Sequence, residues 1–492
     1  MDLREAIKLL EQEGRLITID QEVDWYLEAC AVSAMMYRVN DGRYAVLYNN
    51  VKDYYPDKGR LIGNLWAGSR RRPWERVALF MGLPKDITRR QFLQEVTRRE
   101  RNPVKPLEIS AGDAPCKEII KMGKEANLLD LPITFSHGTD GGRYLTILGI
   151  INQDPDTGWT NVGNYRWMVK SPRRGAALWQ MGQHGPTIYY MKYEARGNTM
   201  PFCIALGSDP LFFTVACAPL PAGYCEYDFV GALRDRPLEV VRAQTNNLLV
   251  PADAEVIIEG EVRPGERTDE GPFGEYSGYT QGRNISPIFR INCITTRKNP
   301  ILPAHTEGIR WNDECGAIIG METGYLHDCE RFGLKRPKDW WLYPQAYSLS
   351  AMPFEAACPE DLTRLAQVSF YSKQSVFNGN LLIPCDPDVD TSDIRDVFEQ
   401  VSLNYDPRTV IFSGQDVLNS PLNFFTDADN RAKYIDGGKR LWDATTQFKP
   451  WSYPKKVSFE YAYPLEVREK VAEIWSKLGF DQGIERKDPE ML

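Results

Sequence analysis

Two glutamates in one short stretch are the residues of this chain best suited to acid–base chemistry. Glu270 and Glu275 lie five positions apart in EGPFGEYSGY, residues 270–279, which holds three glycines and a proline. This composition disfavours a helix and a regular strand, so we expect a bent loop to carry both acids. On an apolar loop the two carboxyl groups can acquire different pKa values, because burial raises one while a cation keeps the other ionised. The alternative is a hairpin connection with two solvated glutamates.

A second unusual stretch is NVGNYR, residues 161–166. Asn161 and Arg166 would face opposite sides of an unbroken strand because their separation is odd. Gly163 can introduce a bulge that brings both side chains to one site. The guanidinium of Arg166 offers a planar fork that matches a carboxylate. A plain cross-strand salt bridge is the alternative role for this arginine.

Three polar side chains are suited to a hard divalent cation. Asn161 is followed along the chain by His184, in QMGQHGP, and by Glu226, in GYCEYD. An amide oxygen, an imidazole nitrogen and a carboxylate are acceptable ligands for Mn²⁺ or Mg²⁺. A single histidine between glycines is more often a turn residue, so His184 taken alone leaves both interpretations open.

Length and composition describe a multidomain globular protein. The chain has 492 residues, a net charge of -8, 42% hydrophobic residues and 26% charged residues. No window approaches the ~20 apolar residues of a membrane-spanning helix, and the negative charge argues against broad binding to nucleic acid. The N-terminal stretch lacks the features of a signal peptide. Ten scattered cysteines without a CxxC pair favour reduced thiols in a cytoplasmic protein.

Apolar periodicity divides the chain into parts of different structural class. We predict an N-terminal α/β domain at 1–115, a β-rich domain at 116–306, a linking helix at 307–335 and a C-terminal α/β domain at 336–492.

Within the β-rich part the pattern predicts short strands separated by turns, including 185–195 and 212–218, as in a barrel or sandwich. A helix near 228–244 interrupts them. The chain ends in an amphipathic helix at 465–480, which packs either on its own domain or on a partner subunit.

Taken together, these residues and their surroundings resemble the UbiD family of flavin-dependent decarboxylases. The similar stretches are NVGNYR, GQHGP, PFCIALGSDP, GYCEYDFVGALRDRPLEVV, EVIIEGEV, EGPFGEYSGY and ITTRKNPI. The resemblance covers most of the chain and is strongest from about 130 to 300. It implies an α/β multidomain fold whose central part is a split β-barrel that binds a flavin, and at least a homodimer.

The resemblance also implies a prenylated FMN cofactor, which a flavin prenyltransferase supplies. Its phosphate would be held through Mn²⁺ or Mg²⁺, with Asn161, His184 and Glu226 as ligands. A K⁺ ion would lie nearby, bound by Glu226 and by backbone carbonyls at about 215–218. The cofactor-binding residues implied in this way are Asn161, Tyr165, Arg166, Gln183, His184 and Glu226.

The implied reaction is a reversible, non-oxidative decarboxylation of an aromatic, heteroaromatic or α,β-unsaturated carboxylic acid. Loss of CO₂ from an sp² carbon leaves an unstable carbanion, and the modified flavin serves as a covalent electron sink. Arg166 would orient the carboxylate and stay paired with Glu270, while Glu275 would protonate the carbon. The alternative is a flavin carrier or reductase of the same fold, which would not need this triad.

The sequence indicates less about the substrate pocket than about the reaction. In the family it draws on segments that correspond here to 321–327 and 418–425, and the apolar residues of the second segment would suit an aromatic body. His305 or His327 would meet a polar ring substituent, although His327, on a helix beside Asp328 and Glu330, is better suited to a surface or an interface.

The chain departs from the family pattern at one lysine. This lysine usually precedes the DxDVD-like turn of the C-terminal part, where the present chain has Asn380, with Lys373 as the nearest alternative. A contact of this part with the cofactor is therefore in doubt.

Overall fold

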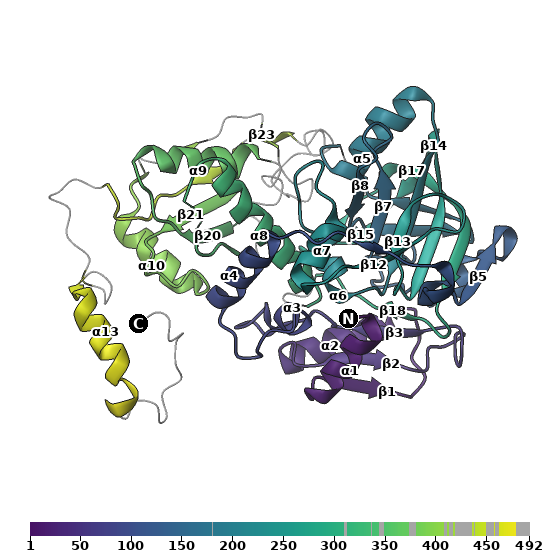
Figure 1. Ribbon diagram of the computed structural model, residues 1–492, viewed down its shortest axis with the longest axis horizontal. Coiled ribbons are helices and arrows are strands. Elements are labelled where there is room, and N and C mark those ends of the chain that lie inside the picture. The colour runs from purple at the N-terminus through teal and green to yellow at the C-terminus, as the bar shows by residue number, and fades with distance from the viewer. Residues whose placement is uncertain are drawn as a thin grey trace. The chain divides into compact units, whose positions relative to one another are not determined.

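The computed structural model consists of two compact units, Met1–Gly324 and Tyr325–Leu492 (Figure 1). The finer domain division at 115, 306 and 335 stays a prediction. None of the described helices is long and apolar enough to cross a membrane, and all ten cysteines are free thiols. The structure describes residues 1–179, 181–308, 312–335, 337–343, 349–372, 380–407, 411–412, 417–418, 435–436, 438–448, 457 and 462–478.

The first unit opens with a small α/β layer. Its elements are α1 (Leu3–Gln12), β1 (Leu16–Ile19), α2 (Glu28–Asn40), β2 (Ala45–Tyr48), β3 (Arg60–Gly63), α3 (Glu75–Phe80), α4 (Arg89–Glu100) and the later strand β18 (Ile301–Pro303). The strands form one mixed sheet in the order β1-β2-β3-β18, on which α1 and α2 pack. A capping box starts α1, because the side chains of Asp2 and Glu5 each accept the other's backbone N–H.

The centre of the first unit is a curled antiparallel sheet. Its strands are β5 (Ile119–Met122), β6 (Tyr144–Leu145), β7 (Gly149–Gln153), β8 (Thr160–Gly163), β9 (Trp167–Ser171), β10 (Arg174–Ala177), β11 (Met200–Leu206), β14 (Val256–Glu270) and β17 (Asn284–Thr296). They follow the order β6-β9-β10-β17-β14-β11-β7-β8, and β5 pairs with β17. The predicted fold class, with a β-barrel-like central domain between α/β parts, is confirmed.

Helices and short strands surround this sheet. They are β4 (Leu107–Glu108), α5 (His184–Ile188), α6 (Pro210–Ala216), α7 (Glu226–Arg234), β12 (Glu239–Arg242), β13 (Leu249–Pro251), β15 (Phe273–Gly274) and β16 (Thr280–Gln281). Residues 185–195 and 212–218, predicted as strands, are helical instead. The helix predicted over 228–244 ends at Arg234, and β12 follows it, because Asp235 adopts a left-handed conformation.

The boundary between the units falls within α8 (Glu314–Arg331), the helix predicted near 312–332. The remaining elements are β19 (Trp341–Leu342), β20 (Leu349–Pro353), α9 (Glu360–Tyr371), β21 (Leu381–Cys385), α10 (Ile394–Asn404), β22 (Ile411–Phe412), β23 (Val417–Leu418), β24 (Ile435–Asp436), β25 (Arg440–Leu441) and α13 (Leu465–Ile474). The order β19-β20-β21-β25-β22 combines parallel and antiparallel pairs, as predicted for a second α/β part. Residues 419–425 and Lys373, which the family pattern singles out, lie outside the described residues.

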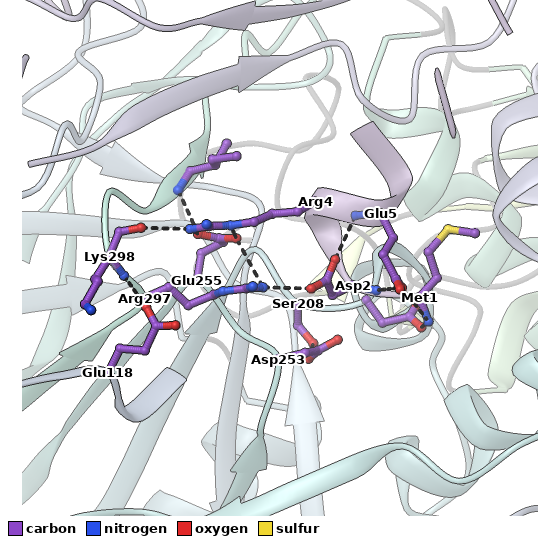
Figure 2. Close-up of polar contacts among 12 residues, drawn as sticks. Met1, Asp2, Arg4, Glu5, Glu118, Ser208, Asp253, Glu255, Arg297 and Lys298 are labelled. Carbon is purple, nitrogen blue, oxygen red and sulfur yellow. Dashed lines mark hydrogen bonds and ion pairs between the residues drawn. The ribbon is translucent and has the colours of Figure 1, made fainter. Parts of the chain in front are cut away.

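Hydrogen bonds and ion pairs in a polar cluster connect α1 to the central sheet (Figure 2). Arg4 donates two hydrogen bonds, of 2.7 and 2.8 Å, to the fully buried carboxylate of Glu255, which precedes β14. The backbone N–H of Ile301 donates to the same carboxylate at 3.0 Å, and Arg297 donates to Asp2 at 2.8 Å. The first helix therefore carries the guanidinium that neutralises a buried acid of the neighbouring layer.

Asp253, in the same cluster, is predicted to lower the stability of the protein as the pH rises. Burial raises the pKa of Asp253 to about 7, and Asp209 adds to the shift. In the unfolded chain this carboxyl ionises near its ordinary pKa of 3.8. Its contribution to the free energy of unfolding is therefore fully present below that pH and is lost as the pH rises through about 7. Asp253→Asn should raise the free energy of unfolding by roughly 2 kcal/mol at pH 8, about half of the full shift because the side chain is half-buried. Thermal and denaturant unfolding at pH 4 and pH 8 measure the difference.

Asp156→Asn is the matched control, with the opposite sign. Arg196 and Lys192 hold the pKa of the Asp156 carboxyl at about 2, so its stabilising contribution is present above its ordinary pKa and lost below it. The control should therefore lose stability at pH 8. Equal stability of Asp253→Asn and the wild type at pH 8 would contradict the prediction.

Candidate functional site

Arg166 lies in a break between two strands of the central sheet. β8 ends at Gly163 and β9 begins at Trp167, so the predicted bulge in one continuous strand is wrong. The aromatic ring of Tyr165 folds back over Gly163, where an added Cβ would lie 2.6 Å from the ring. A larger residue at this position would displace the ring, so glycine lets Tyr165 lie against the end of β8, directly before the buried Arg166.

The two glutamates of the 270–279 stretch are both buried. Glu270 is the last residue of β14 and has no exposed surface, and Glu275 is 6% exposed. Between them the chain forms β15, which pairs with β16 in a short hairpin. The expected bent loop is therefore partly a hairpin, and the alternative of two solvated glutamates is wrong.

Arg166 joins both acids. Its Nε and Nη2 donate to the two oxygens of Glu270 at 2.9 and 2.7 Å, which is a bidentate pair. Its Nη1 donates to Glu275 and, at 2.8 Å, to Oε1 of Gln281. The hydroxyl of Tyr144 donates to Glu270 at 3.0 Å. Glu270 is thus saturated with donors, whereas the hydrogen bond from Arg166 to Glu275 engages only one carboxyl oxygen.

The surroundings raise the pKa values of both Glu275 and Arg166. Burial raises the pKa of Glu275 to about 7, against the opposing effect of Arg166, and Glu307 and Glu270 add to the rise. Burial acts to lower the pKa of Arg166, but Glu275 and Glu270 outweigh burial and raise that pKa above its ordinary value. The arginine is a permanent cation, and Glu275 can hold a proton near neutral pH.

An apolar cluster lies next to the Arg166–Glu270 pair. Tyr144, Met168 and Phe273 form a small buried cluster beside the hairpin. The ring of Phe273 lies 5.1 Å from the Cζ atom of Arg166 and 4.4 Å from the ring of Tyr144. These apolar side chains keep water from the side of Arg166 that they cover, which strengthens the electrostatic interactions of its guanidinium.

The three residues predicted as metal ligands lie on β8 and on two helices that pack against it. Asn161 belongs to β8 and is buried, and His184 is the first residue of α5. Glu226 is the first residue of α7, and its Oε2 accepts the backbone N–H of Val162 at 2.9 Å. Both α5 and α7 contact β8. The imidazole of His184 stands on edge against Trp159, with 4.8 Å between the ring centroids.

The polar atoms of this region fit a cation and a polar cofactor group. Nδ2 of Asn161 donates to Oδ1 of Asn152 at 3.0 Å, which fixes the amide and turns its carbonyl oxygen away from that neighbour. Among the described residues, Oε1 of Gln183 is buried without a hydrogen-bond partner. A buried oxygen of this kind takes a hydrogen bond from a water or a ligand, or binds a cation. Tyr165 is buried beside it and accepts the backbone N–H of Gly185 at 3.4 Å.

The remaining histidines have different surroundings. Nε2 of His305 lies 3.1 Å from Glu307, and its Nδ1 lies 3.5 Å from Asp313. Burial acts to lower the pKa of His305, but these acids raise it well above its ordinary value. His327 lies in α8 and is half-buried. Asn380 directly precedes β21.

Several contributors to the site were missed in the sequence. Tyr144 and Gln281 both contact the charged triad, yet nothing in their local sequence distinguishes them from core or surface residues. Gln281 follows EGPFGEYSGY by two positions, and its side chain reaches Arg166 only because β16 folds back on β15. The hairpin identifies Gln281, and the pairing of β6 with β9 identifies Tyr144.

Comparison with known proteins decides the family. Residues 108–310 match the model of the 3-octaprenyl-4-hydroxybenzoate carboxy-lyase Rift-related domain, and residues 7–96 match that of the N-terminal domain of the same enzyme. The chain is 30% identical to the pyrrole-2-carboxylic acid decarboxylase of Pseudomonas aeruginosa over 98% of both chains. The chain belongs to the UbiD family. It is a carboxy-lyase of the UbiD class, and the resemblance seen in its sequence is confirmed.

Solved structures of UbiD proteins match nearly the whole fold. The closed form of vanillic acid decarboxylase from Sedimentibacter hydroxybenzoicus is 26% identical, with a TM-score of 0.82 over 97% of this chain and 98% of that chain. An evolved dimeric form of the UbiD-class enzyme HmfF from Pelotomaculum thermopropionicum, in complex with prFMN, is also 26% identical. Its TM-score is 0.75, over 92% of this chain and 96% of that chain.

Proposed function

We propose that this UbiD protein decarboxylates an aromatic or heteroaromatic carboxylic acid with prenylated FMN, and that Glu275 supplies the proton. The observation that carries the proposal is the buried Glu275, whose pKa is raised to about 7, in contact with an arginine that another glutamate already neutralises. A general acid works best when its pKa lies near the working pH. The pair Arg166–Glu270 leaves Glu275 free for that role.

The proton balance of the reaction requires such an acid. The substrate enters as a carboxylate, the bond between its ring carbon and the carboxyl carbon breaks, CO₂ leaves, and the ring carbon gains a proton. One proton is therefore consumed in each turnover, and Glu275 donates it and is reprotonated from solvent. The bound prenylated flavin supplies an electrophilic sink for the electron pair that CO₂ leaves behind.

Arg166 has two tasks in this proposal. Its guanidinium attracts and orients the incoming carboxylate, which places the bond to be broken. It also donates to the carbonyl oxygen of protonated Glu275, so that the acidic O–H is left to face the substrate. Glu270 keeps the guanidinium in one orientation through the bidentate pair.

The cofactor and ions are assigned to the region around β8. Asn161, His184 and Glu226 would hold Mn²⁺ or Mg²⁺ at the flavin phosphate, with K⁺ near Glu226. Tyr165 and Gln183 would complete the flavin site, and the unpartnered oxygen of Gln183 supports this assignment. A flavin prenyltransferase would supply the cofactor, and the dimeric form of HmfF supports a homodimer.

The relatives support an aromatic substrate class. Pyrrole-2-carboxylic acid, named for the first relative, carries its carboxyl group on a five-membered heterocycle, and vanillic acid, named for the second, carries it on a benzene ring. Identities of 30% and 26% support the class of acid and not a particular ring. An α,β-unsaturated acid presents the same sp² carbon and belongs to the same test.

Purification from cells that make prenylated FMN tests the proposal. The absorbance spectrum, the metal content and CO₂ release are measured across a panel of pyrrole, furoic, hydroxybenzoic, cinnamic and polycyclic carboxylic acids. We expect bound flavin and CO₂ release from at least one ring class. Bound flavin without CO₂ release from any acid would favour a flavin carrier or reductase, and the absence of both would refute the proposal.

A further inference from the structure

His137 connects the turn that carries Glu275 to a second segment of the chain. Its Nδ1 lies 3.3 Å from Oδ2 of Asp140, and its Nε2 lies 3.2 Å from the backbone carbonyl oxygen of Glu307. The other oxygen of Asp140 accepts the backbone N–H of Gly274 at 2.8 Å. Gly274 directly precedes Glu275. The imidazole of His137 is therefore linked to Glu307 directly and, through Asp140, to the turn that carries Glu275.

Two glycines allow these segments to approach closely. A Cβ on Gly274 would lie 2.7 Å from Nδ1 of His137, so the imidazole rests directly on the backbone of the turn. Gly308 has a φ of +77°, and a Cβ there would lie 3.0 Å from Cα of Gly278. The segment 305–308 therefore lies against the end of the turn that begins at Glu275.

The hydrogen-bond partners define the protonation state of His137. A carboxylate and a backbone carbonyl can only accept hydrogen bonds, and a neutral imidazole has a single N–H. Both contacts form together only when both ring nitrogens carry a proton, that is, in the imidazolium. The charged groups that face the ring are the acids Asp140 and Glu307, and the edge of Phe273 is its aromatic neighbour.

The electrostatics agree with this geometry. Burial acts to lower the pKa of His137, but Asp140 and Glu307 raise it above its ordinary value of 6.5. His305, 3.1 Å away, favours the ionised form of Glu307. Burial acts to raise the pKa of Glu307, and His305 outweighs it. The segment 305–307 thus carries an anion that favours the charged form of His137.

We propose that His137 is a positioning residue, which as an imidazolium clamps the Glu275 turn against residues 305–308 and so keeps the Glu275 carboxyl buried. Its kinetic consequence rests on the proposed function, because only there does Glu275 act as an acid. The raised pKa of Glu275 arises mainly from burial, so a released turn would admit water and return that pKa toward its ordinary value. Less of the acid would then be protonated at neutral pH.

The clamp is tested first without any activity. The chain has four histidines, so the ring signals of ¹³C-labelled histidine can be assigned by the loss of one signal in His137→Gln. We expect His137 to titrate above pH 6.5 and its pKa to fall in Asp140→Asn. Hydrogen exchange of residues 271–281 should accelerate in His137→Gln, and their protection relative to the intrinsic, base-catalysed exchange rate should fall in the wild type as the pH rises through the pKa of His137. Titration at or below pH 6.5, or unchanged exchange in His137→Gln, would overturn the clamp.

The kinetic measurements use the flavin-loaded protein and the carboxylic acid of the panel from which it releases CO₂ fastest. His137→Gln should lower kcat on the order of tenfold at pH 7 with little change in KM, and should move the alkaline loss of activity to lower pH. Asp140→Asn should have a similar effect, and the double variant should be no worse than either, because both break one clamp. Thr139→Ala is the control: it removes only an exposed hydrogen bond of 3.3 Å, which Oγ1 of Thr280 donates to Thr139, and should change these values much less.

The experiments distinguish a failure of the positioning role of His137 from a failure of the proposed function. A pH profile of His137→Gln that coincides with the wild type would overturn the positioning role even if kcat fell. If the wild type released no CO₂ from any acid, the proposed function would fail. The titration and exchange measurements would still decide whether the clamp exists.

Discussion

Glu275→Gln is expected to lower CO₂ release by about 10³-fold while leaving flavin bound. Glutamine has the shape of glutamic acid, and its carbonyl oxygen can still accept the hydrogen bond that Arg166 donates to Glu275. It has no acidic proton for the carbon that loses CO₂. Turnover of the best acid, together with the flavin absorbance of the same preparation, measures the effect.

The control for this variant is Gln281→Ala. Gln281 also accepts from Nη1 of Arg166, at 2.8 Å, but it carries no proton for transfer, so this variant should lose much less activity. Undiminished turnover of Glu275→Gln would remove Glu275 from the reaction. Loss of flavin from Glu275→Gln would show instead that the variant disrupts the site.

Substitution of Arg166 is expected to have a comparable effect through a different cause. Arg166→Ala leaves the fully buried Glu270 without its cation, which costs about 3–5 kcal/mol when a buried pair is broken. The protein should therefore lose both stability and activity. Arg166→Lys retains the charge but cannot form the bidentate pair, so we expect a stable protein whose turnover falls about 10²-fold.

Tyr144→Phe is the matched control for the Arg166 variants. It removes only the hydroxyl that donates to Glu270 at 3.0 Å, a hydrogen bond worth roughly 1–2 kcal/mol. Unfolding and CO₂ release are measured on all three variants. Wild-type turnover of Arg166→Lys would contradict the assignment of Arg166 to the substrate carboxylate.

Much of the fold followed from local patterns in the sequence. The helix at Leu3–Gln12 has an apolar face and a clear capping signal. β14 begins with a β-branched apolar run that favours a strand, and this first half is buried on both faces and not on one. The six polar residues predicted for the site were singled out because their types and spacing resemble the pattern of a family, and their roles stay predictions.

The errors have identifiable physical causes. Residues 185–195 are rich in aromatic and β-branched side chains, which favour strands, but tertiary packing makes them helical. For α6 the sequence contained a usable signal, because Asp209 caps the helix and Pro210 occupies its first turn. That signal was outweighed by the apolar run that follows it.

The charged triad could be predicted in membership but not in geometry. Spacing identified Arg166, Glu270 and Glu275, yet their contacts depend on the strand break after Gly163 and on the hairpin of β15 and β16. Both features arise from long-range pairing, and a local pattern cannot encode them. Burial of Glu275, which sets its acidity, is likewise a property of the assembled site.

The pH dependence of CO₂ release by the flavin-loaded protein tests the central claim most directly. A general acid must be protonated to act, so activity is present below its pKa and is lost as the pH rises through it. With the pKa of Glu275 raised to about 7, we predict half-maximal kcat near pH 7 and a tenfold loss per pH unit above it. A kcat that stays constant from pH 6 to pH 9 would contradict Glu275 as the proton donor.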